Sequence, residues 1–140
     1  MKNYEKCLNV DFSLSDIMGE HLEEKFRECV SLILKIDEEL RDSEVKGGSI
    51  DVLKSRLSDL RDALSELPYY LVELAKKRLE REKADVFMKA MFSEMDDAKN
   101  FITAALIVAN LPTADVKTIA TVIRHKLSDL IAFLRLLATW

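Results

Sequence analysis

The apolar residues of this chain recur at alternating intervals of three and four positions along most of its length. Four successive stripes follow this spacing: Leu22, Phe26, Cys29, Ile33, Ile36 and Leu40; Ile50, Leu53, Leu57, Leu60, Leu64 and Leu67; Ala84, Met88, Met91, Met95, Ala98, Ile102, Ala105 and Ala109; and Val116, Ala120, Ile123, Leu127, Leu130, Leu134 and Leu137. A mean spacing of about 3.5 residues keeps one face of an α-helix against a partner helix. The pattern therefore predicts an all-α fold, an elongated antiparallel bundle of helical hairpins with heptad-like apolar stripes and four to five helices.

Glycine and proline predict where the first helices end. Gly47 and Gly48 can close the first helix in a left-handed turn, and Ser49 is then a natural cap for the second. Pro68 lacks a backbone N–H and disfavours helical geometry in the residue before it, so a break or kink is expected there. The resulting helices are expected over residues 15–45, 49–67, 69–110 and 114–138.

Polar residues predict further helix caps. Ser13 and Ser93 each have an aspartate three positions later, which is the spacing of a capping box. The cap at Ser13 would begin the first helix. The cap at Ser93 would divide the long 69–110 helix near residue 93, so this segment is either one continuous helix or two. Asn110 or Thr113 is expected to cap the last helix.

Composition agrees with long helices that have charged outer faces. The chain is 49% hydrophobic and 33% charged, with three glycines and two prolines. A single helical domain is expected over residues 15–140, after an N-terminal arm or short helix over residues 1–14. Cys7 and Cys29 are too few for a disulfide framework, and the opening residues contain no apolar run of the signal-peptide kind. These features predict a soluble protein in the reducing cytoplasm.

The final helix is apolar on most of its sides between Leu130 and Leu137. A helix that is apolar all round must be buried on all sides, which is hard to arrange within one small bundle. The expected homo-oligomer or partner interface consists of Leu130, Ile131, Phe133, Leu134 and Leu137, and Leu134→Asp is expected to dissociate the oligomer. The alternative is a central helix surrounded by the other three. Peripheral membrane contact is a weaker alternative, because the helix has few cations.

Candidate chemistry is sparse. His21 and His125 are not preceded by a glutamate three positions earlier, as two-metal carboxylate bundles require, and no zinc, phosphate-loop or nucleophile motif is present. Carboxylates are plentiful, but they lie where helix surfaces should be solvated, and nothing marks the desolvated cleft that a catalytic acid needs. The sequence therefore predicts neither an enzyme nor a bound metal or cofactor.

One segment carries a concentration of positive charge with aromatic residues before it. The candidate nucleic-acid face combines Tyr70 with cations of a basic helix expected over residues 76–89, namely Lys76, Lys77, Arg78, Arg81 and Lys83. Cations that follow phosphates, together with aromatic rings on which bases stack, are typical of single-strand binding. The alternative is a solvated helix face, because acidic and basic residues recur four positions apart along the segment.

The leading hypothesis is a non-enzymatic helical interaction and assembly protein that self-associates and binds another macromolecule, with another protein as the expected partner. The first alternative is a single-stranded nucleic-acid-binding accessory protein of the recombination or replication type. In layout, with Tyr69 and Tyr70 leading into a basic helix and an apolar helix at the C-terminal end, the chain resembles small phage recombination-accessory proteins that bind single strands as oligomers. No specific motif carries this resemblance, so no functional residues are transferred from it.

Overall fold

The computed structural model describes residues 19–139, with side chains from His21 onward, and within this range the chain forms four α-helices. They are α3 (Gly19–Lys46), α4 (Ile50–Arg78), α5 (Arg81–Val108) and α6 (Val116–Leu137). The predicted all-α fold is confirmed. The expected N-terminal arm and the expected cap at Ser13 lie outside the described residues.

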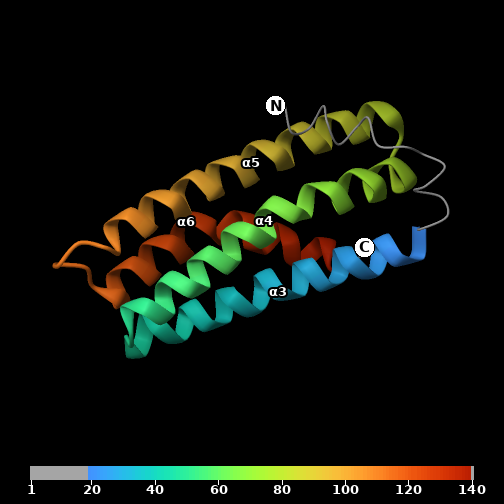
Figure 1. Ribbon diagram of the computed structural model, residues 1–140. Helices are drawn as coiled ribbons and strands as arrows, with labels where there is room; N and C mark the ends of the chain where they lie inside the picture. The colour runs from blue at the N-terminus through green and yellow to red at the C-terminus, as the bar shows by residue number, and fades with distance from the viewer. Residues whose placement is uncertain (1–18, 140) are drawn as a thin grey trace.

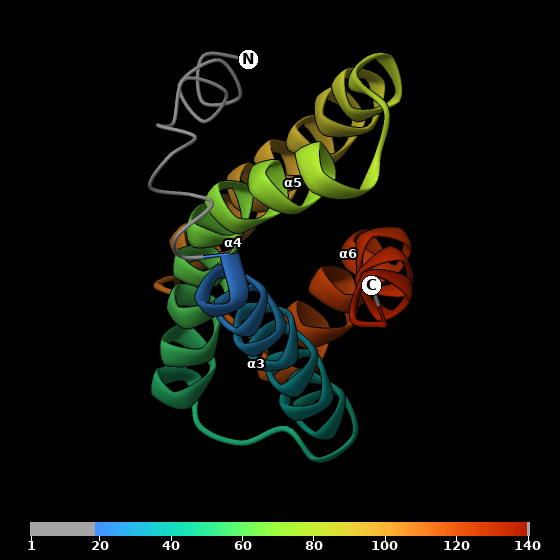
Figure 2. The same cartoon turned by 90° about the vertical axis from the view of Figure 1, so that its right-hand side faces the viewer.

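Successive helices run antiparallel and form an elongated bundle (Figure 1). Helix α3 packs against α4 and α6, and α5 packs against α4 and, less extensively, against α6. The order around the bundle is therefore α3, α4, α5, α6, as expected for helices joined by short connections. Viewed along the bundle, the first half of α5 leans away from the second half of α6 (Figure 2).

The predicted stripes form the core. Every stripe residue is buried except Leu22, Ile50 and Ala105, which are partly exposed. Leu57 and Leu64 of α4 are completely buried, and the expected core cysteine Cys29 is buried as well. Burying a large aliphatic side chain contributes about 1.5–3 kcal/mol, so the four stripes supply the main favourable term for folding.

Ion pairs fix α6 against α3. Arg124 lies 3.3 Å from an oxygen of Asp37 and 2.7 Å from an oxygen of Glu44. Asp37 is buried and also lies 3.8 Å from the guanidinium of Arg135. If the two helices slid past one another, these ion pairs would break and leave partly buried charges uncompensated. The ion pairs therefore define the register of α3 and α6.

The turn between α3 and α4 follows the sequence prediction. Gly47 has a φ of 76° and donates its N–H to the carbonyl of Ser43 at 2.8 Å. Glycine adopts this left-handed geometry without the steric cost that a Cβ brings. The Ser49 hydroxyl accepts a hydrogen bond from the N–H of Asp51 at 3.2 Å, so the predicted N-cap is confirmed.

The break expected at Pro68 is wrong, because α4 continues through Pro68 to Arg78. The missing N–H and the ring together cost a helix about 3 kcal/mol. The next turns nevertheless bury Leu71, Val72 and Leu74. Their burial offsets the cost of the proline, so packing overrides the local rule.

The real break is a sharp corner at Leu79 and Glu80, and α5 runs without interruption past residue 93. Leu79 has an extended backbone, with φ −122° and ψ 149°. No glycine or proline marks this corner. It falls where the apolar spacing thins out: between Ala75 and Ala84, Leu79 is the one apolar residue, and it is partly buried against the core.

The cap of α6 is Asp115, not Asn110 or Thr113 as expected. The Asp115 carboxylate accepts hydrogen bonds from the backbone N–H of Thr118, at 3.1 Å, and from the Thr118 hydroxyl. An aspartate at this position satisfies a backbone donor and interacts favourably with the positive end of the helix dipole.

Two leucines of α6 provide a matched test of the packing. Leu134 is 0% exposed and Leu136 is 68% exposed. Leu134→Ala should lower the free energy of unfolding by about 2–5 kcal/mol because it opens a cavity, whereas Leu136→Ala should change it by less than about 0.5 kcal/mol. Urea titrations followed by circular dichroism measure both values, and equal values would contradict the burial of Leu134.

The Asp115 cap predicts a pH dependence of stability. The hydrogen bonds from the Thr118 side chain and backbone lower the pKa of Asp115 below its ordinary value of 3.8. A folded-state pKa below the unfolded one gives stability that is present above the unfolded pKa and is lost as the pH falls through the folded pKa. Asp115→Asn keeps a good cap but does not titrate. Urea titrations from about pH 6 to pH 2 should therefore show the wild type losing stability relative to this variant only at the acid end. A difference that stays constant with pH would contradict the prediction.

Candidate interaction groove between α5 and α6

The structure places most of the predicted interface of the final helix inside the bundle. Leu130, Ile131, Leu134 and Leu137 are buried, and Phe133 is 39% exposed. In a single chain, these four buried residues therefore belong to the core and not to the surface. A change such as Leu134→Asp would report on folding and could not isolate self-association.

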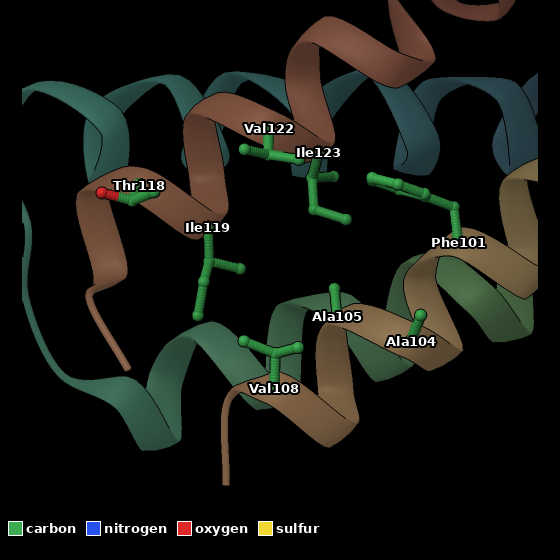
Figure 3. A pocket seen from close by; sticks show the side chains of 8 residues that line it. All are labelled: Phe101, Ala104, Ala105, Val108, Thr118, Ile119, Val122 and Ile123. Carbon is green, nitrogen blue, oxygen red and sulfur yellow. The ribbon is translucent and has the colours of Figure 1, made fainter. Parts of the chain in front are cut away.

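A different set of apolar residues remains accessible along the seam between α5 and α6. At the end nearest the α5–α6 connection, a hollow of about 230 Å³ opens between the two helices. Its lining consists of Phe101, Ala104, Ala105, Val108, Thr118, Ile119, Val122 and Ile123 (Figure 3). The small side chains of Ala104 and Ala105 leave this space, while Val108 and Val122 remain exposed beside it.

A second apolar hollow of about 220 Å³ lies toward the other end of the seam. Its walls include Ala90 and Met91 of α5 and Phe133 of α6, and Glu94 and Asp129 line it on the side toward the middle of the seam. The rings of Phe87 and Phe133 are 6.0 Å apart between centroids and are tilted by 37°. This tilted contact bridges α5 and α6 where the two helices lean apart.

Between the two apolar hollows the seam is charged. A third hollow, of about 230 Å³, is lined by Glu94 and Asp97 of α5 and by Lys126 and Asp129 of α6. The Lys126 ammonium lies 5.7 Å from the centroid of the Phe101 ring, so it leans toward the first hollow. We call the three successive hollows the α5/α6 groove. It extends along α5 from Phe87 to Val108, about 30 Å at the rise of an α-helix.

The groove was missed in the sequence because its residues lie outside the main stripes. Phe87, Glu94, Phe101 and Val108 are spaced seven apart and form a second stripe on α5. Val122 and Phe133 of α6 also lie outside the main stripe of their helix, and they face the same seam. The sequence signal of the groove is this second heptad stripe on α5, which is apolar at both ends and charged in the middle.

The predicted basic helix is wrong as a single element. Lys76, Lys77 and Arg78 end α4, whereas Arg81 and Lys83 begin α5 on the other side of the corner. Basic residues in the last turn of α4 also interact favourably with its dipole. The cations thus form a cluster at a helix corner instead of a continuous face.

Acidic groups accompany this corner. Arg78 lies 3.2 Å from Glu23 of α3, Lys76 lies 3.9 Å from the buried Glu73, and Lys83 lies 3.7 Å from Glu80. Tyr70 is partly buried, and its pKa is raised by burial and by the charge of Glu66. The Tyr70 ring is therefore only partly accessible from solvent.

Cys29 and the two histidines lie in different environments. The Cys29 thiol donates to the carbonyl of Ala63 at 3.3 Å, and burial raises its pKa to about 12, so the nucleophilic thiolate is not formed near neutral pH. His21 and His125 are exposed. Among residues 21–139, no group of three or more histidine, cysteine, aspartate or glutamate side chains could hold a metal ion.

Two further observations bear on partners. None of the helices in the described range combines the length and the apolar character needed to span a bilayer. A wide, open depression of about 610 Å³ is lined by Glu23, Glu24, Arg27, Glu28 and Ser31. All five belong to α3, so this is the charged outer surface of one helix and not a cleft between elements.

Comparison of the chain with known protein families, curated proteins and solved structures found no match.

Proposed function

We propose that this protein is a non-enzymatic helical interaction protein whose α5/α6 groove binds a helix of another protein. The observation that carries the proposal is the exposure of facing apolar residues on two neighbouring helices. Val108 of α5 is 45% exposed and Val122 of α6 is 46% exposed, and both border a hollow lined mainly by carbon. Apolar area of this kind favours burial by about 25 cal/mol per Å².

The shape of the groove favours a helix as the bound element. An amphipathic helix binds such a groove through residues spaced three and four apart on one face. The separate hollows of about 220–230 Å³ are smaller than the roughly 300–1,000 Å³ of small-molecule sites. They match single side chains that enter from a helix lying along the seam.

The self-association expected from the sequence stays a prediction. Of its five interface residues, Phe133 is the one that the described bundle leaves on the surface, with Leu136 exposed a short distance along α6. Contact between copies through α6 would therefore use these residues and the groove, not Leu134.

Binding can be tested with a helical peptide of three heptads that carries leucine at the core positions of its outer heptads and glutamine in the middle one. Val122→Glu should weaken binding at least about tenfold, because it puts a charge into an apolar contact. Val52→Glu is the matched control, since Val52 is 47% exposed on α4 and does not line the groove. Fluorescence anisotropy of the labelled peptide measures both affinities. Absent or equal binding would contradict the proposal.

A second candidate function is single-stranded nucleic-acid binding at the α4–α5 corner. The observation that favours it is the gathering of exposed cations, Lys77, Arg78, Arg81 and Lys83, around one turn of the chain. Phosphate contacts by such cations release counterions, so the affinity would fall steeply with salt.

The corner can be tested by charge reversal. Lys77→Glu with Arg81→Glu should abolish binding of a labelled single-stranded oligonucleotide at low salt and leave helicity intact. Lys35→Glu with Arg41→Glu makes the same charge change at exposed positions of α3 and should bind like the wild type. If the two double variants behave alike, or if the wild type does not bind at low salt, the corner is not a nucleic-acid site.

A further inference from the structure

We propose that the helix bound in the α5/α6 groove is basic at its centre and apolar at both ends. This inference rests on the proposed function, and it adds the chemistry of the partner. Its basis is the division of the groove into two apolar hollows with a charged one between them.

The central hollow is strongly acidic for its size. Three carboxylates, those of Glu94, Asp97 and Asp129, face one ammonium group, that of Lys126. Within the described part of the chain, none of these three carboxylates forms an ion pair. Lys126 leans over the Phe101 ring, so the acidic groups are left to a cation from outside.

The spacing of the groove sets the spacing of the partner. On α5 the charged position Glu94 lies one heptad from Phe87 and one heptad from Phe101. Each heptad rises about 10.5 Å along a helix. A partner helix of three heptads would therefore place apolar side chains in both outer hollows and lysine or arginine in the middle one.

Charge also argues against a second copy of this chain as the occupant. A two-fold axis through the groove would bring its acidic centre against its own image. Six carboxylates would then face two lysines, and like charges at close range are unfavourable. A partner with a cationic centre meets the same surface with opposite charge, which improves both its specificity and its rate of association.

The test compares three peptides of three heptads, each with leucine at the core positions of the outer heptads. The middle heptad carries lysine, glutamine or glutamate at its core positions. By fluorescence anisotropy, the full chain should bind the lysine peptide at least about tenfold more tightly than the glutamate peptide, with the glutamine peptide between them. The ratio of the affinities for the lysine and glutamate peptides should decline toward one at about 1 M salt, where the Debye length is about 3 Å.

A charge-neutralised groove identifies the source of this preference. The triple variant Glu94→Gln, Asp97→Asn and Asp129→Asn should bind all three peptides about equally. The matched control, Glu38→Gln, Asp59→Asn and Asp62→Asn, changes the net charge by the same amount at exposed positions of α3 and α4, and it should keep the wild-type preference.

The outcomes separate the inference from the function on which it rests. Equal affinity for the three peptides, or loss of the preference in the control variant, would overturn the basic-centred partner and leave the groove as a helix site. Failure of all three peptides to bind would overturn the proposed function itself. Sedimentation of the wild type as a dimer that Phe133→Glu dissociates would instead identify a second copy as the occupant, and would overturn the inference.

Discussion

The packing of α6 on α3 is the constraint on which the rest of the structure depends. Leu134 is completely buried, and Arg124 reaches across to Asp37 and Glu44 of α3. An apolar stripe and an ion-pair cluster therefore fix the orientation of α6 about its own axis. Since α6 has apolar residues on more than one side, the side turned away from α3 must meet α5 or remain exposed.

Helix α5 covers that second side only in part. Its alanines at positions 104 and 105 are too small to fill the space opposite Ile119 and Val122, so a hollow remains instead of a closed interface. The main stripe of α5 is directed into the bundle, where Met88 and Met95 are buried. Each of the two helices thus buries its main stripe in the core. Their second apolar stripes face each other across the seam and are only partly buried, which leaves apolar area exposed.

The sequence predicted the parts of the fold that depend on local spacing and turn chemistry. The stripes, the glycine turn at Gly47 and the cap at Ser49 each follow from a few neighbouring residues. The proline at position 68 and the corner at Leu79 depend on how much apolar area the following residues bury, which local rules do not measure. The groove depends on which secondary faces of α5 and α6 meet, and that is known only when the helices are placed against one another.

The charged middle of the groove gives a physical reason why α5 and α6 do not close against one another. Glu94 and Asp129 line the same hollow from opposite helices, and like charges at short range oppose a closer approach. Leucine at these positions would continue both secondary stripes and would favour a complete seam within the chain. The same carboxylates that would select a cationic partner therefore also keep its site from being filled by the bundle itself.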